Sequence, residues 1–134
     1  MSRLVHRIFF FMLLVTVSLI WNCKKQIELD GFDREHWVED QLGCNGFRLS
    51  QRQIILENQS HFLGHTSRQI IKLLGKPDRN ELFRRNQKFY IYVMEPGPDC
   101  MDNHEHKYPE TLFIRFSATG LCQEIFIKKG SAPI

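Results

Sequence analysis

The sequence has little charge imbalance, and this argues against one class of partner. Of its 134 residues, 18 are Lys or Arg and 15 are Asp or Glu. Arg3 and Arg7 lie in the first 22 residues, which hold no acid, so residues 23–134 carry 16 basic and 15 acidic side chains. Nucleic-acid-binding proteins concentrate positive charge on one face. We therefore expect no nucleic-acid partner.

The usual marks of catalysis are also lacking. The chain has no glycine-rich phosphate loop, and none of its serines has the flanking glycines of a nucleophile elbow. Its length corresponds to one domain and excludes a multidomain enzyme. We expect no catalytic residue, no cofactor and no small-molecule substrate.

No apolar run is long enough for an ordinary membrane-spanning helix, but a shorter run follows Arg3 and Arg7. Residues 8–21 are uncharged and mostly apolar. A spanning helix needs about 20 apolar residues, whereas a run of about 14 is typical of a signal peptide. Residues 1–22 are therefore predicted to be a signal peptide. The alternatives are an uncleaved signal anchor and ordinary cleavage nearby, although no A-x-A-like site lies close to residue 23.

The residue that ends this segment is Cys23, and the arrangement resembles the lipobox of bacterial lipoproteins. Ile20 and Asn22 stand where that family prefers Leu and a small residue. The resemblance implies that the chain is cut before Cys23 and that its thiol carries palmitate-type acyl chains. Lys24 and Lys25 follow, where an inner-membrane retention signal usually places Asp. We expect a lipid anchor in the outer membrane, on its periplasmic face.

The spacing of apolar residues along the rest of the chain is first typical of helices and then, from about residue 80, typical of strands. Asp33 is a candidate N-cap, and Thr66 with Gln69 predicts a capping box. A short helix is predicted to follow Asp33 and to run through Trp37 to Leu42, and further helices are predicted over residues 49–63 and 67–74. Strands are predicted over residues 81–84, 88–95, 111–117 and 121–128.

Helices followed by strands predict an α+β fold. We expect two to three helices on one face of a three- to four-stranded antiparallel sheet, formed by a single domain over residues 33–129. A lipidated tether over residues 23–32 precedes it, and a frayed tail over residues 130–134 follows it.

Alternation along the strands divides the sheet residues into two sets. The more aliphatic set is assigned to the face that the helices cover: Phe89, Ile91, Val93, Leu112, Ile114, Phe116, Ile125 and Ile127. The more aromatic set is assigned to the other face: Tyr90, Tyr92, Met94, Phe113, Arg115, Cys122 and Phe126.

Five residues of the aromatic set are of types enriched at interface hot spots, and we predict that they bind a partner: Tyr90, Tyr92, Phe113, Arg115 and Phe126. The alternative is that the helix around Trp37 or the loop over residues 96–109 covers this face within the monomer.

Residues 64–78 read GHTSRQIIKLLGKPD, a helix that ends in G-x-P, and residues 112–121 read LFIRFSATGL, the centre of a hairpin. This pattern resembles the SmpA/OmlA (BamE-like) family of small outer-membrane lipoproteins. The resemblance covers residues 64–128, about half of the chain. It implies helices packed on an antiparallel sheet, as in β-lactamase inhibitor proteins, and a non-catalytic assembly or binding role with an envelope protein as partner. An inhibitor-like domain that presents its sheet to an enzyme is a further possibility for this fold.

The cysteines other than Cys23 suggest one disulfide. Cys44 and Cys100 both lie in turn-rich segments, and an exported location is oxidising. We favour a bond between them, which would add about 3–4 kcal/mol to the free energy of unfolding. Cys122 lies within a strand and is predicted to be a buried thiol. Three free thiols are the alternative.

The polar loop before the third strand carries the alternative function. Cys100, His104 and His106 could serve a small exported redox or metal-handling protein, with His61 and His65 as further ligand candidates. Zinc sites normally draw ligands from separate elements with characteristic spacings. No such spacing is present, so a solvated loop without metal is our expectation.

Overall fold

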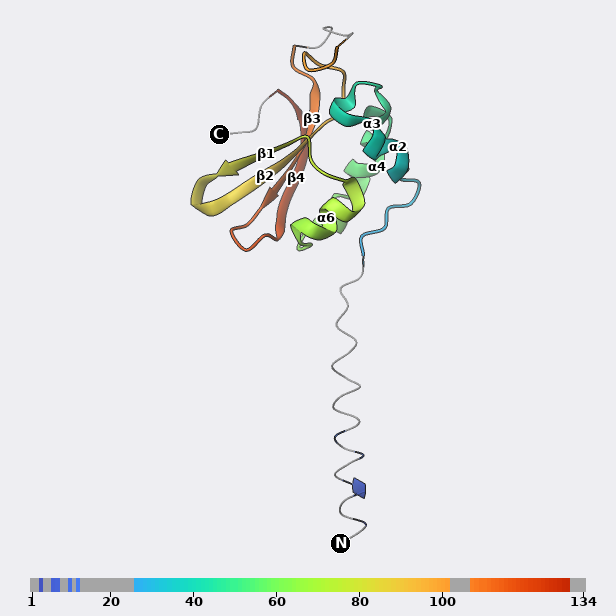
Figure 1. The fold of residues 1–134 in the computed structure, drawn as a ribbon, viewed down its shortest axis with the longest axis vertical. Helices are drawn as coiled ribbons and strands as arrows, with labels where there is room; N and C mark the ends of the chain where they lie inside the picture. The colour runs from blue at the N-terminus through green and yellow to red at the C-terminus, as the bar shows by residue number, and fades with distance from the viewer. Residues whose placement is uncertain are drawn as a thin grey trace.

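A four-stranded antiparallel sheet lies beside a layer of short helices (Figure 1). The computed structural model describes residues 26–101 and 107–130, together with the isolated positions 3, 6, 7, 10 and 12. The strands follow one another in chain order across the sheet: β1 (Arg79–Phe83), β2 (Gln87–Val93), β3 (Glu110–Phe116) and β4 (Cys122–Lys129). The predicted α+β class is confirmed.

The helical layer precedes the sheet in the chain. Its α-helices are α2 (Arg34–Glu39), α3 (Phe47–Ser50), α4 (Arg52–Glu57), α5 (Gln59–Phe62) and α6 (Ser67–Leu74). There are also two 3₁₀ turns. The first, η1 (Gln41–Gly43), follows α2, and the second, η2 (Arg84–Asn86), connects β1 to β2.

Both predicted helix starts are confirmed. The Asp33 carboxylate accepts a hydrogen bond from the backbone N–H of His36 at 3.2 Å. Thr66 and Gln69 form the full capping box at the start of α6. These side chains satisfy N–H groups that have no partner within the helix, so each start is determined locally.

The single helix predicted over residues 49–63 is wrong in detail. The segment forms three short helices, α3, α4 and α5, separated at Gln51 and Asn58. The Asn58 side-chain amide donates to the Ile54 carbonyl at 2.8 Å, a local bond of the kind that competes with regular helix.

The boundary predicted between tether and domain also needs correction. Ile27 is 4% exposed and Leu29 is 9% exposed, and both belong to the main hydrophobic core. Buried and exposed residues alternate here, because Gln26 and Glu28 are exposed. One side of this extended segment therefore packs into the core and the other side faces solvent. The folded body therefore begins before residue 33. Residues 131–134, most of the predicted frayed tail, lie outside the described residues.

The main core fills the space between the helices and the sheet. Its largest members include Trp37, Tyr92, Phe62, Phe116 and Ile70. Two aromatic side chains also hydrogen-bond to the end of α6: the Trp37 indole N–H donates to the Leu74 carbonyl at 3.1 Å, and the Tyr92 hydroxyl donates to the Gly75 carbonyl at 2.9 Å. Burial raises the pKa of the Tyr92 hydroxyl, which keeps it a neutral donor.

Gly75 makes the close approach of α2 and α6 possible. It has φ of 76°, and a Cβ at this position would lie 2.9 Å from a methyl group of Val38. A glycine here lets α6 end against α2 without strain.

The face assigned to β2 is wrong. Tyr90 pairs with Ile114 and Tyr92 with Leu112, so the tyrosines lie on the helix-covered face, with Met94 in the same core. Phe89 and Ile91 lie on the opposite face, where they pack with Phe113. Alternation divides one strand into two sets, but only the register decides which set matches the neighbouring strand.

The role of the Tyr92 hydroxyl is testable by Tyr92→Phe. We expect the free energy of unfolding to fall by about 1–2 kcal/mol, because the buried Gly75 carbonyl loses its donor. Urea unfolding followed by circular dichroism measures the change. Tyr108→Phe is the matched control, since Tyr108 is 60% exposed; equal effects of the two substitutions would contradict the prediction.

Candidate functional site

The five predicted partner-binding residues do not share a surface. Tyr90 is 7% exposed and Tyr92 is fully buried beneath the helices, so their placement on the partner face is corrected. Phe113, Arg115 and Phe126 do lie on the other face of the sheet, which carries none of the helices in the described part of the chain. We call this surface the open face (Figure 1).

An aromatic cluster occupies the centre of the open face. It consists of Phe83, Phe89, Ile91, Phe113 and Phe126. The rings of Phe113 and Phe126 stack at 5.3 Å between centroids, and Phe83 meets Phe89 edge-on at 5.2 Å. Phe89, Ile91 and Phe113 are 1–2% exposed, whereas Phe83 and Phe126 are half-buried. A partner would therefore contact mainly Phe83 and Phe126.

Charged and polar side chains border this cluster. The Arg115 guanidinium donates to Glu124 at 2.8 Å and to the Gln87 side chain at 2.9 Å. The Lys128 ammonium lies 5.7 Å from the centroid of the Phe113 ring. The border thus holds Arg115 in a fixed position at the edge of an apolar surface, an arrangement common in protein interfaces.

A hollow extends the open face at the end near the loop that precedes β3. Arg79, Val93 and Thr111 belong to the open face by register and also line this cavity, which has a volume of about 270 Å³. The cavity reaches Cys100 on the other side. The open face therefore combines a flat aromatic part with a concave end that is lined by both polar and apolar residues.

Sequence reasoning missed three members of the cluster. Phe83 was not singled out, and Phe89 and Ile91 were assigned to the helix side. The length of the connection between β1 and β2 could have predicted this placement. A hairpin turn over residues 84–86 pairs Phe83 with Gln87 and Glu81 with Phe89, which puts Phe83 and Phe89 on the same face of the sheet.

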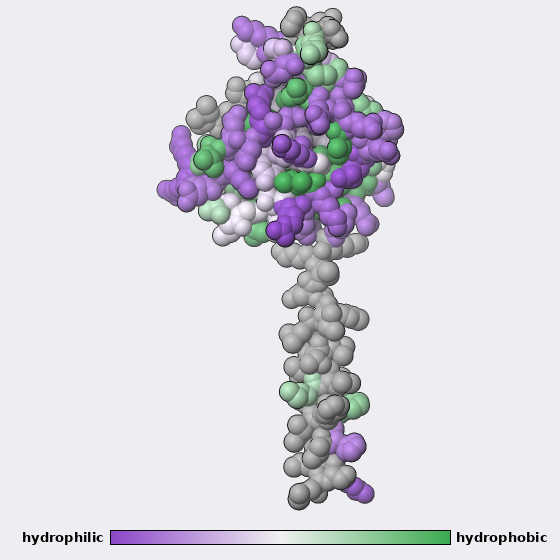
Figure 2. Space-filling model, viewed as in Figure 1, coloured by the Kyte–Doolittle hydropathy of each residue, from purple (hydrophilic) through white to green (hydrophobic). Residues whose placement is uncertain are grey.

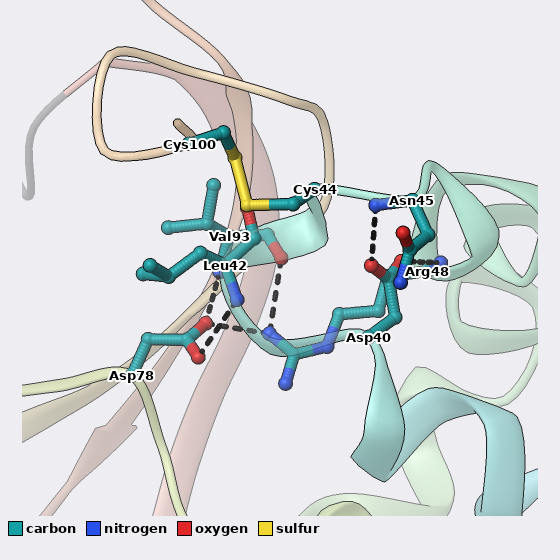
Figure 3. Close-up of a disulfide and its surroundings, with 8 residues drawn as sticks. All are labelled: Asp40, Leu42, Cys44, Asn45, Arg48, Asp78, Val93 and Cys100. Atoms are coloured by element: carbon teal, nitrogen blue, oxygen red, sulfur yellow. Dashed lines mark hydrogen bonds and ion pairs between the residues drawn. A yellow bond between two sulfur atoms is a disulfide. The ribbon is translucent and has the colours of Figure 1, made fainter. Parts of the chain in front are cut away.

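A buried polar network lies behind the sheet, where the segment over residues 40–48 meets the start of β1 and the end of β2 (Figure 3). Arg48 is its centre. The guanidinium donates to Asp78 at 2.5 Å, to the Val93 carbonyl at 3.1 Å and to the Trp37 carbonyl at 3.0 Å. The side chains of Arg48 and Asp78 are only 1% and 5% exposed.

The carboxylates of Asp40 and Asp78, near Arg48, also accept hydrogen bonds from backbone N–H groups. Asp40 accepts from Asn45 at 2.7 Å and from Arg48 at 2.9 Å. Asp78 accepts from Leu42 at 3.2 Å and from Val93 at 2.8 Å. These bonds determine the path of the chain around η1. The burial of Arg48 was not predictable locally, because its acceptors Asp78 and Val93 lie 30 and 45 positions away in the chain.

Cys44 and Cys100 form a disulfide at the edge of this network (Figure 3). Their Cα atoms are 5.6 Å apart, and they are separated by 56 positions in the chain. This is the pairing that the sequence favoured. Cys122 is a buried free thiol, as expected, and burial raises its pKa to about 11.

The residues named for the redox and metal alternative are only partly described. Cys100 is bonded to Cys44 and offers no thiolate, while His104 and His106 lie outside the described residues. Within residues 26–101 and 107–130, no three His, Cys, Asp or Glu side chains are grouped as metal ligands would be. His61 and His65 instead line a cavity of about 240 Å³ with residues 26–28.

The predicted signal peptide and Cys23 fall almost wholly outside the described residues. Among the helices that are described, none is long and apolar enough to cross a membrane. In comparisons with known proteins, no family model matches the chain, and no curated protein matches it. The resemblance to the SmpA/OmlA lipoproteins therefore remains a prediction.

The buried ion pair predicts an unequal response to two arginine substitutions. We expect Arg48→Met to lower the free energy of unfolding by about 3–5 kcal/mol, because Asp78 is left buried without its counter-charge. Arg115→Met removes an ion pair whose side chains are 24% and 49% exposed, and we expect less than about 1 kcal/mol. Chemical unfolding of both variants measures the difference; similar losses would contradict the assignment.

The disulfide is testable by peptide mapping without reductant. We expect one cross-linked peptide pair containing Cys44 and Cys100, with Cys122 alkylated only after unfolding. The double substitution Cys44→Ser with Cys100→Ser should lower the free energy of unfolding by about 3–4 kcal/mol, because the unfolded chain gains freedom. A free Cys44 in protein purified without reductant would overturn this pairing.

Proposed function

We propose that this chain is a lipid-anchored, non-catalytic binding module of the bacterial outer membrane, with its body on the periplasmic side. The anchor is Cys23, and the partner is an envelope protein that contacts the open face. The proposal combines the amino-terminal sequence pattern with the chemistry of a sheet surface.

The observation that carries the binding role is the apolar character of the open face. An antiparallel sheet that faces water normally alternates apolar residues inward and polar residues outward. Here Phe83, Phe89, Ile91, Phe113 and Phe126 form a second apolar cluster on the side without described helices. Half-buried aromatic rings beside an arginine are typical of interface hot spots.

The disulfide supports the exported location. Disulfides persist in oxidising compartments and are rare in the cytosol. The bond between Cys44 and Cys100 joins two segments that lie on the helical side and in the loop before β3. A body stabilised in this way is suited to the periplasm.

The anchor is tested by Cys23→Ser in the full-length gene. We expect the unaltered protein to fractionate with the outer membrane and to show, by intact mass, a chain that begins at an acylated Cys23. The variant should lose the acyl mass and leave that fraction. An unmodified, full-length wild-type chain among the soluble proteins would refute the proposal.

The partner surface is tested by Phe126→Ser in the anchored protein. Loss of a hot-spot aromatic costs about 2 kcal/mol, so we expect a roughly 30-fold weaker association with the partner that co-purifies with wild type. Leu82→Ser is the matched control. Leu82 is 87% exposed, and its side chain does not lie on the open face, because it pairs with Lys88 and not with Phe89. Thermal unfolding of both variants confirms folding. Equal recovery of the partner with both would exclude the open face as the binding surface.

A further inference from the structure

Very little chain separates the predicted lipid from the folded body. Only residues 24–26 lie between Cys23 and Ile27, and Ile27 is 4% exposed within the main core. A fully extended chain spans at most about 3.5 Å per residue, so the Cα atoms of residues 23 and 27 are within about 14 Å of each other. An acylated Cys23 would therefore hold the region around Ile27 at the level of the lipid headgroups.

The structure identifies which part of the body this is. The cavity beside residues 26–28 is lined from the other side by His61 and His65. His61 belongs to α5, and His65 immediately precedes the N-cap of α6. Figure 1 shows α6 near the end of the body at which the described chain begins. The corner between α5 and α6 thus lies beside residues 26–28, the described residues that follow the predicted anchor.

This corner combines exposed apolar and basic side chains. Leu63 is 48% exposed and Ile71 is 36% exposed. Arg68 and Lys72 are exposed, and with Ile71 they share one side of α6 because they lie three and four positions apart. We call Leu63, Arg68, Ile71 and Lys72 the α6 surface.

Within α6 the charged side chains are both basic, Arg68 and Lys72, and further basic side chains lie nearby. The Arg34 side chain donates to the Lys72 carbonyl at 2.9 Å, which places a further cation beside the end of this surface. Lys24 and Lys25 lie in the short connection to Cys23. The segment that leads into α2 also holds acids, namely Glu28, Asp30, Asp33 and Glu35. Figure 2 shows hydrophilic side chains surrounding small apolar patches on the visible side of the body.

We propose that the α6 surface docks on the bilayer that holds the anchor, through anionic phospholipid headgroups. Basic side chains are attracted to anionic lipid, and apolar side chains between them enter the headgroup boundary. This inference rests on the proposed function, since it needs an acylated Cys23. Docking through the helical layer leaves the opposite, open face of the sheet accessible to a protein partner.

The experiment uses the acylated, full mature protein in nanodiscs that contain phosphatidylglycerol and a headgroup-spin-labelled lipid. Intact mass of the same sample establishes acylation. We expect paramagnetic broadening of the backbone amide signals of residues 63–72, and none in the β1–β2 hairpin around Leu82. Phosphatidylcholine alone, or high salt, should reduce the broadening because the attraction to anionic lipid is screened or absent.

The deciding variant is Arg68→Glu with Lys72→Glu. It should lower the docking equilibrium constant by roughly 30-fold, given the attraction of two basic residues near an anionic surface, and it should reduce the broadening accordingly. Arg84→Glu with Arg85→Glu changes net charge equally at the hairpin and should leave the broadening as in wild type. Leu63→Ser with Ile71→Ser is a second variant that alters the surface without altering charge, and it should also weaken docking.

The outcomes separate the two proposals. An acylated wild-type protein that shows no broadening over residues 63–72 in anionic nanodiscs would overturn the docking and leave the lipid anchor established. The same holds if both charge-reversal variants behave alike. A chain without acylation at Cys23 would instead refute the proposed function and the docking that depends on it.

Discussion

One buried guanidinium joins the helical layer to the sheet. Arg48 donates to the carbonyl of Trp37 in α2, to the carboxylate of Asp78 before β1 and to the carbonyl of Val93 at the end of β2. Its guanidinium also lies 5.3 Å from the Trp37 ring centroid and 5.8 Å from that of Tyr92. Without it, the carbonyls of Trp37 and Val93 would lose a donor and the buried Asp78 carboxylate would lose its counter-charge, and both losses are costly. The mutual placement of α2, β1 and β2 depends on this one side chain.

The segment over residues 40–48 connects this network to the disulfide. A Cβ on Gly43 would lie 2.5 Å from the carbonyl carbon of Met94, so the turn packs directly against the end of β2. Cys44 then bonds to Cys100 in the loop that follows. Polar bonds, close packing and a covalent link all act within a few residues. Together they hold the amino-terminal part of the body on the helix side and leave the open face uncovered by it.

The local elements were largely predictable from the sequence. Thr66 with Gln69, and Asp33 before α2, specify helix starts through bonds between neighbours in the chain. The four strands follow from alternation and turn residues. The pairing of Cys44 with Cys100 was favoured because both lie in turns of a chain with an export pattern. The break at Asn58 was not foreseen, because a side chain that bonds to its own preceding turn leaves the apolar spacing unchanged.

The candidate site was only partly predictable from the sequence. Composition pointed to Phe113, Arg115 and Phe126, and these do lie on the open face. It also pointed to Tyr90 and Tyr92, which are buried because the register of β2 places them on the helix-covered face. There the Tyr92 hydroxyl donates to the Gly75 carbonyl. Similarly, Ile27 and Leu29 belong to the main core, although the short segment around them shows no helical or strand pattern over a longer range.

The sequence by itself determined the type and order of the elements, their caps and the two sets of side chains on each strand, because these depend on residues close together in the chain. Only the tertiary structure decided which set of β2 faces the helices, where the body begins relative to Cys23, and that an arginine forms the centre of the core network. Each of these depends on strand register and on packing between segments far apart in the chain, and the local period carries no information about either.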